Sequence, residues 1–254
     1  MGKIYRWLLF LILALQLLAC SSEEKEDVWQ SLFNGRNLDG WVMKFSGSEL
    51  NHNYRNTFQV EDSILKVSYD NYDTFNNRYG HLFYEKPFSN YRLQLQYRFT
   101  GEKLPDSPWW TENNSGVMIH SQAPETIPLI PDPMDKNVEF LAHFPVSIEC
   151  QLLGNAVTAN ACQIQTLVDV NGERAKERNI YSDSPNYKPG QWVQLEIIVY
   201  ADSLVHHVVE HDTVLTYTNL RRTDNGEPLK SGYIALQAES QPVQFRKIRI
   251  LELH

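Results

Sequence analysis

Two stretches of the chain combine residue types that can do acid–base chemistry with the spacing of β-strands. They read NNSGVMIHSQ (113–122) and FPVSIECQLLG (144–154). Alternate side chains of a strand share a face, and one face of each stretch concentrates amide, imidazole and carboxylate groups. The residues on these faces are Asn114, His120, Gln122, Glu149 and Gln151. Such groups move protons and hold hydroxyl groups, so the pattern predicts a polar-ligand site on a sheet surface.

Other segments hold side chains that could join this site. His81 lies in GHLF, while Trp109 and Trp110 lie in a Pro-rich segment before the first stretch. Gln237 and Glu239 share strand parity in LQAES near the C-terminus. The tryptophans could stack on a sugar ring or close one end of the fold.

Each candidate also has a structural alternative. Glu149 could form an ion pair with a buried arginine such as Arg98, and His120 could be a hydrogen-bonded histidine at a sheet edge. His81 is more readily explained as structural than as catalytic. The sequence leaves these alternatives open.

The elements that must position these residues are mostly strands. Period-two alternation and Gly, Pro and Asn turns recur along the chain, and no amphipathic helix of three turns follows residue 28. This predicts an all-β sandwich or jelly roll with two long Pro-rich loops, 104–110 and 123–136. The expected strands are 58–60, 64–67, 80–84, 91–99, 116–121, 146–152, 162–168, 192–200, 204–209, 214–217, 232–239 and 243–253.

The first residues predict export and lipidation. Lys3 and Arg6 precede a short apolar run, 7–18, that ends in Leu-Leu-Ala-Cys. This is the pattern of bacterial lipoproteins, in which Cys20 becomes the lipidated N-terminus. We therefore expect a signal peptide (1–19), a lipidated acidic tether (20–28) and one domain (29–254). The tether resembles those of Bacteroidetes lipoproteins on the outer membrane, which predicts a lipid-anchored, surface-exposed protein.

Charge narrows the expected partners. The 254 residues carry a formal charge of −8, which becomes −10 without Lys3 and Arg6 of the signal. Because nucleic acids require basic surfaces, no nucleic-acid partner is expected. A neutral sugar, a cation or a solvated extracytoplasmic surface suits this balance.

Two short motifs leave structural questions. In an oxidising compartment Cys150 and Cys162 could form a disulfide or remain two buried thiols. The fragment HVVEH (207–211) matches a zinc-protease pattern that requires a helix. Its flanking valines indicate a hairpin instead, so we expect no zinc site there.

Several segments together resemble one known family. They are LFNGRNLDGW (32–41), FQVEDSILKV (58–67), YGHLFYEKPFSNYRLQLQYRF (79–99), NSGVMIHSQ (114–122), FPVSIECQLLG (144–154), GQWVQLEIIVY (190–200) and SGYIALQAESQPVQFRKIRILEL (231–253). In this order they resemble the 3-keto-disaccharide hydrolase-like family, once catalogued as a domain of unknown function. The resemblance implies a concanavalin A-like jelly roll that acts on glycosides. The segments 155–185 and 206–217 depart from the family pattern.

The substrate class implied by this resemblance suggests a mechanism. A ketone at C3 of a sugar acidifies the C2 proton, so one base can start elimination of the C1 group before water adds. Glu149 or His120 would be the base, with hydrogen bonds from Asn114, Gln122 and Gln151. His81, Trp109, Gln237 and Glu239 would also contact substrate. A divalent metal ion held by His120 and Glu149 could stabilise the enolate, although no spacing requires one.

Two functions are thus expected from the sequence. The first is a hydrolase or lyase that cleaves glycosidic bonds, of 3-keto-glycosides in particular. The second is a non-catalytic carbohydrate-binding lipoprotein of a glycan-uptake system. His120 and Glu149 favour the enzyme, because a lectin needs no base.

Overall fold

The computed structural model of the protein describes residues 28–253. The predicted signal peptide, Cys20 and the tether up to residue 27 lie outside these residues, so their predictions remain predictions. Among the described residues, no helix has the length and apolar character needed to cross a membrane.

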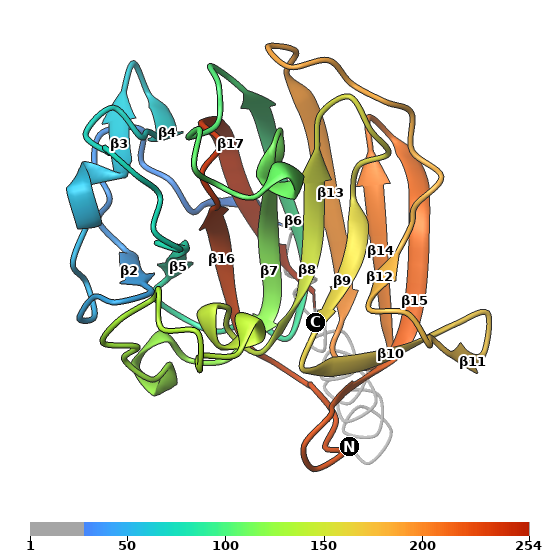
Figure 1. Ribbon diagram of the computed structural model, residues 1–254. Coiled ribbons are helices and arrows are strands. Elements are labelled where there is room, and N and C mark those ends of the chain that lie inside the picture. Colours follow the sequence, from blue (N-terminus) through green and yellow to red (C-terminus); the bar gives the residue numbers. More distant parts are fainter. Residues whose placement is uncertain (1–27, 254) are drawn as a thin grey trace, which may run out of the picture.

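Two antiparallel sheets pack face to face, which confirms the predicted all-β sandwich. The first sheet has seven strands in the order β12-β9-β8-β7-β16-β5-β2. The second has ten, in the order β11-β10-β15-β14-β13-β6-β17-β4-β3 with β1 paired to β17. In Figure 1, β16, β7, β8 and β9 of the seven-stranded sheet lie side by side.

The elements have the following bounds. The strands are β1 (Gln30–Ser31), β2 (Trp41–Phe45), β3 (Phe58–Glu61), β4 (Ile64–Val67), β5 (Gly80–Tyr84), β6 (Asn90–Phe99), β7 (Asn114–Ser121), β8 (Ser147–Leu153), β9 (Asn160–Ile164), β10 (Thr166–Val170), β11 (Glu173–Arg174), β12 (Asn179–Ile180), β13 (Val193–Tyr200), β14 (Leu204–Val209), β15 (Asp212–Arg222), β16 (Tyr233–Ala238) and β17 (Val243–Glu252). The short 3-10 helices are η1 (Tyr54–Asn56), η2 (Trp109–Thr111), η3 (Pro124–Thr126) and η4 (Phe140–His143).

Alternation along the strands builds the core. On β8, Ile148, Cys150 and Leu152 are fully buried against the ten-stranded sheet. Glu149 and Gln151 point to the outer face of the seven-stranded sheet. Glu149 is nevertheless buried, because the connection from β7 to β8, which contains η3 and η4, covers that face. The fold thus places a polar sheet surface beneath a loop.

The predicted strand 162–168 is wrong in one respect, because it is two strands in different sheets. Gln165 has a positive φ of 53° between β9 and β10, and the chain crosses there from the seven-stranded to the ten-stranded sheet. Apolar residues recur at Cys162, Ile164, Val168 and Val170, so the every-second-residue pattern continues across Gln165 and does not reveal the crossing.

The predicted hairpin at 206–217 is confirmed. β14 and β15 pair directly, and Glu210 occupies the turn with a positive φ of 55°. His207 is buried, with Nδ1 2.8 Å from the Ala159 carbonyl and Nε2 3.0 Å from the Tyr217 hydroxyl. His207 is therefore a buried residue on a strand of the hairpin and not a ligand on a helix.

Candidate active site

Glu149 occupies space that a glycine leaves open. Gly116 on β7 pairs with Gln151 on β8 and also lies beside Glu149. A Cβ atom at position 116 would lie 2.5 Å from Glu149 Oε1. The absence of a side chain at Gly116 therefore lets the carboxylate lie across β7 toward β16.

A second carboxylate approaches from the end of β16. Glu239 is 3% exposed and directly follows this strand. The next residue is fixed, because Ser240 N–H donates to the Tyr69 hydroxyl at 2.7 Å and Ser240 Oγ to Thr111 Oγ1 at 2.7 Å. These bonds hold the backbone that aims Glu239 into the same cavity as Glu149.

The cavity has a volume of about 220 Å³ and combines polar and aromatic walls. Its lining residues are Trp110, Asn114, Phe140, Leu141, Phe144, Glu149, Gln151, Cys162, Ile164, Arg178, Asn179 and Glu239. Trp110 stacks against Tyr79 with an interplanar angle of 4°, and Phe140 meets Trp110 edge-on at 5.5 Å between centroids. Rigid aromatic faces beside hydrogen-bonding groups suit a sugar ring.

Arg178 supplies the positive charge of the cavity. It directly precedes β12, and its guanidinium lies 5.9 Å from the Phe140 ring centroid. The residue is exposed, which places its charge at the solvent side of the cavity. Arg178 opposes the effect of burial on both carboxylates by lowering their pKa values.

The two carboxylates have different electrostatic surroundings. Burial raises the pKa of Glu149, while Arg178 and a hydrogen bond from the Cys162 thiol lower it. Burial raises the pKa of Glu239 well above its usual range, and the negative charge of Glu149 raises it further. Two buried carboxyl groups that repel each other resist being ionised at the same time. Glu149 is the group that ionises first, since it has the additional hydrogen bond.

Several buried polar atoms at this sheet face lack hydrogen-bond partners among the described residues. They are Glu149 Oε1, Glu239 Oε2, Asn114 Oδ1, His81 Nε2 and both side-chain atoms of Gln237. Leaving such an atom unpaired costs about 1–3 kcal/mol, so native proteins rarely collect them without a function. Their convergence on one face indicates a ligand site.

The structure brings together four of the predicted site residues. Glu149, Glu239, Asn114 and Gln151 line the cavity. Gln237 lies on the same face, because its neighbour Leu236 pairs with the core residue Val117 and the next side chain along the strand points outward. The side chains that share strand parity therefore meet on one face of the seven-stranded sheet.

His120 does not belong to this group, which corrects its predicted role as base. It has a positive φ of 47° at a β-bulge between β7 and β16. The bulge shifts the alternation, and His120 Nε2 donates to the Ala201 carbonyl at 3.0 Å, beside the ten-stranded sheet. Burial lowers the pKa of His120 to about 4. Its Nε2–H is taken by the Ala201 carbonyl, its Nδ1 has no partner among the described residues, and it does not line the cavity that holds Glu149.

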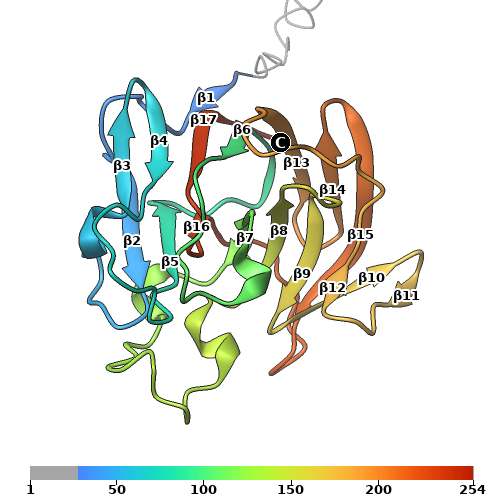
Figure 2. The ribbon, with the colours of Figure 1, turned by 45° about the horizontal axis from the view of Figure 1, so that its top comes forward.

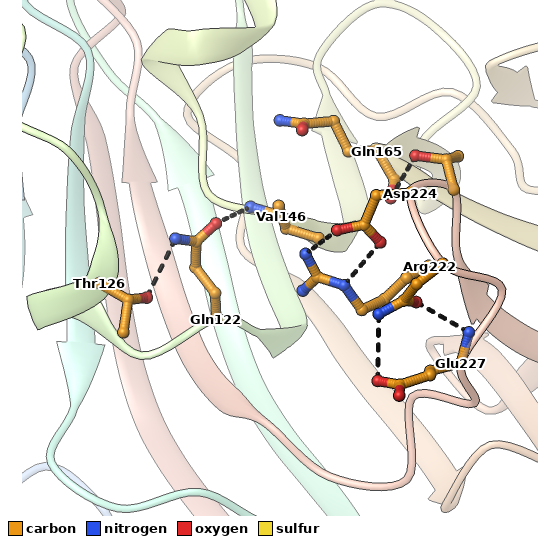
Figure 3. Close-up of polar contacts among 9 residues, drawn as sticks. Gln122, Thr126, Val146, Gln165, Arg222, Asp224 and Glu227 are labelled. Atoms are coloured by element: carbon orange, nitrogen blue, oxygen red, sulfur yellow. Dashed lines mark hydrogen bonds and ion pairs between the residues drawn. The ribbon is translucent and has the colours of Figure 1, made fainter.

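Gln122 also has a structural position. Its Oε1 accepts the Val146 N–H at 2.8 Å, and its Nε2 donates to Thr126 Oγ1 at 3.1 Å (Figure 3). It therefore joins the two ends of the loop that covers the cavity, rather than contacting a ligand in it.

His81 and Trp109 lie near the cavity but not in its lining. His81 pairs in register with Gln237 and contacts Phe144 at 5.9 Å between rings, and burial lowers its pKa to about 3. Trp109 is 84% exposed, whereas its neighbour Trp110 forms the wall. The tryptophan of the site is thus Trp110.

The proposed disulfide is absent, because Cys150 and Cys162 are both free and buried. Cys162 pairs with Glu149, and Cys150 pairs with Ala161, so the two thiols point to opposite faces of the sheet. Cys150 belongs to the core, and Cys162 belongs to the cavity.

No cluster of three or more His, Cys, Asp and Glu side chains that could hold a metal ion occurs in residues 28–253. The unpartnered atoms of the site are largely oxygens of Glu149, Glu239, Asn114 and Gln237. Oxygen ligands suit hard cations such as Ca²⁺ or Mg²⁺. A divalent ion remains a prediction.

Sequence reasoning missed Arg178 and the aromatic wall of η4. Arg178 lies in the irregular segment between β11 and β12, and no period marks the direction of its side chain.

The alternative of an ion pair between Glu149 and Arg98 is excluded, because Arg98 lies on the other sheet and donates to Gln244.

Comparison with known proteins identifies the family. The model of the 3-keto-alpha-glucoside-1,2-lyase-like domain matches residues 28–251, so the chain belongs to this family. No curated protein matches.

Solved structures share the fold at low sequence identity. A protein of Parabacteroides distasonis, provisionally assigned as a glycosyl hydrolase, has a TM-score of 0.52 and 16% identity over 89% of this chain and 94% of its own. The Bacillus licheniformis beta-glucanase has a TM-score of 0.51 and 9% identity over 90% and 98%. The carbohydrate-binding module CBM66 of Bacillus subtilis has a TM-score of 0.50 and 9% identity over 84% and 96%.

Proposed function

We propose that the protein is an enzyme that cleaves glycosidic bonds of 3-keto-glycosides, with Glu149 and Glu239 as its proton-transfer groups. The observation that carries the proposal is the meeting of two buried carboxylates with unequal surroundings in one cavity. Pairs of titratable groups with separated pKa values are typical of acid–base catalysis. The family membership supports the substrate class.

In this mechanism Glu149 is the base. It takes the C2 proton of the 3-keto sugar, and the electron pair of that C–H bond moves into an enolate between C2 and C3. The enolate then expels the C1 oxygen, which takes a proton from Glu239. The products are an unsaturated keto sugar and the free alcohol, and addition of water to the former completes net hydrolysis.

The remaining groups of the site fit this charge movement. Gln151 and Gln237 offer amide N–H donors to hydroxyl and enolate oxygens, and Arg178 offers a positive charge. Asn114 Nδ2 already donates to the Trp110 carbonyl, so its free Oδ1 can accept from a sugar hydroxyl. Trp110, Phe140 and Phe144 offer apolar faces to the sugar ring. A divalent ion bound to the site oxygens would stabilise the enolate.

Two other functions compete. An ordinary glycosidase also uses two carboxylates, and their presence in one cavity supports it. A non-catalytic carbohydrate-binding protein is supported by the fold shared with CBM66. Burying two repelling carboxylates destabilises the folded state, however, and binding alone requires neither.

The test is turnover of 3-keto-glucosides and of the matching unoxidised glucosides by the purified mature protein, with and without a chelator. We expect turnover of the keto substrates alone, a loss of at least about 100-fold in Glu149→Gln and in Glu239→Gln, and normal rates in the control Glu196→Gln. Turnover of unoxidised glucosides would favour an ordinary glycosidase. Binding without turnover in every condition would leave the carbohydrate-binding function.

A further inference from the structure

The outer face of the ten-stranded sheet carries arginines that lack carboxylate partners. Arg98 on β6 and Arg246 and Arg249 on β17 form no ion pair within residues 28–253. This is unusual for a chain whose formal charge is −8. Arg92 lies on the same face and pairs with Glu196. The face therefore holds local positive charge on an acidic protein.

Glutamines and tryptophans orient these guanidinium groups. Arg98 Nε donates to Gln244 at 2.9 Å, and Arg246 Nε donates to Gln96 at 2.8 Å. Both guanidinium groups lie over the Trp192 ring, at 4.5 and 3.9 Å from its centroid. Their terminal nitrogens make no hydrogen bond with residues 28–253. They are thus held in place while their strongest donors stay available.

Arg98 and Arg246 at Trp192 form a first arginine cluster, and Arg92 and Arg249 at Trp29 form a second one further along β6 and β17. Arg249 donates to Gln94 through two nitrogens and lies 4.7 Å from the Trp29 ring centroid. Arg92 lies 5.8 Å from the same ring. Arg92 and Arg98 are six positions apart on β6, which corresponds to about 20 Å at about 3.3 Å per residue.

A groove of about 530 Å³ lies on this face beside the second cluster. Its lining includes Trp29, Gln94, Gln96, Gln194, Lys247 and Arg249. A β-bulge in β17 between Arg246 and Arg249 forms part of it, with Lys247 at a positive φ of 53°. Figure 2 shows β1, which carries the chain into this region, alongside β17.

From these contacts we infer that this face binds an acidic polysaccharide, separately from the catalytic cavity. Guanidinium groups recognise carboxylate or sulfate groups, and the glutamine amides between them suit hydroxyl groups. Two arginine clusters about 20 Å apart fit a chain of charged sugars better than one small anion. Few carboxylates oppose this binding: Glu196 is paired with Arg92, and Glu210 accepts the Gln194 backbone N–H.

The test is the affinity of the full mature protein for dextran sulfate, polygalacturonate and neutral dextran by isothermal titration calorimetry. We expect both acidic polymers to bind, binding to weaken as salt increases, and neutral dextran not to bind. The double variant Arg98→Gln/Arg246→Gln should bind at least about tenfold more weakly. The matched control is Arg55→Gln/Arg222→Gln, in which Arg55 pairs with Asp73 and Arg222 pairs with Asp224; Figure 3 shows the second pair.

Three results would overturn the inference: no binding of either acidic polymer, equal binding of neutral and acidic polymers, or equal loss of binding in the control variant. Melting temperature and turnover of a small keto-glucoside report on the fold and on the catalytic cavity. Because the double variant leaves the cavity intact, turnover should be unchanged, and a cooperative melting transition shows that the variant remains folded. Failure of polysaccharide binding therefore leaves the proposed catalytic function untouched.

Discussion

At the scale of single residues, the site depends on the Glu149 carboxylate, which occupies space that Gly116 leaves open because it has no side chain. Glu149 lies where a Cβ of residue 116 would be, so these two positions act together. Glu239 comes from another strand and lacks such support. Its direction follows from the hydrogen bonds of Ser240.

The close approach of Gly116 gives a first prediction. Gly116→Ala should displace the Glu149 carboxylate and reduce kcat/KM for a keto-glucoside by about 100-fold, the loss expected for a misplacement of about 1 Å. Steady-state kinetics measures the effect, and circular dichroism checks that the sheets persist. Wild-type kinetics in a folded variant would show that Glu149 does not act from this position.

The raised pKa values of the carboxylates give a second prediction. A buried carboxyl with a raised pKa keeps its proton in the folded state after the unfolded chain has lost it, so stability falls as pH rises from about 4.5 toward the folded pKa. Glu239→Gln removes this penalty. Its melting temperature should exceed that of the wild type at pH 8, by about 2–4 °C for each kcal/mol, and match it at pH 4.

Glu196→Gln is the matched control for this prediction. Glu196 is similarly buried, but it is paired with Arg92, so its replacement should bring no gain at pH 8. The measured quantity is the melting temperature of Glu239→Gln minus that of the wild type. A difference that is no larger at pH 8 than at pH 4 would contradict the burial of a repelled charge.

Strand alternation explains which residues the sequence could locate. Glu149, Gln151 and Asn114 lie on regular parts of β7 and β8, so counting by twos placed them correctly. His120 follows the bulge, where that count fails. Arg178 and Phe140 lie in irregular segments, whose side-chain directions depend on tertiary contacts that a single sequence does not display.

At the scale of elements, the loop from β7 to β8 forms one wall of the site. It carries Phe140 and Phe144, and Gln122 ties its two ends together. The sequence predicted the long Pro-rich loop 123–136, but it did not predict that Gln122 would bind this loop instead of substrate. A glutamine side chain can bind either a loop or a substrate, and the register of β7 determines which of them Gln122 reaches.

This loop gives a third prediction. Gln122→Ala removes both hydrogen bonds and should loosen the aromatic wall, raising KM about fivefold with little change in kcat, as the loss of about 1 kcal/mol implies. Steady-state kinetics separates the two constants, and hydrogen exchange should increase within 123–146. An unchanged KM would mean that the loop holds its position without Gln122.

At the scale of the whole molecule, two sheets expose two different outer faces. The face of the seven-stranded sheet is covered and carries the carboxylate cavity. The face of the ten-stranded sheet carries the arginines and an open groove. The alternation in β6 predicted its buried and outward residues. The sandwich and the family followed from the sequence. The crossing at Gln165 did not, because apolar residues recur at every second position on both sides of it.

The central claim is that Glu149 abstracts a proton made acidic by a ketone. The most direct measurement is exchange of the C2 hydrogen of a 3-keto-glucoside in deuterated water, followed by NMR together with release of the C1 alcohol. We predict deuterium incorporation or alcohol release with the wild type and neither with Glu149→Gln. Alcohol release by Glu149→Gln at the wild-type rate would contradict the claim.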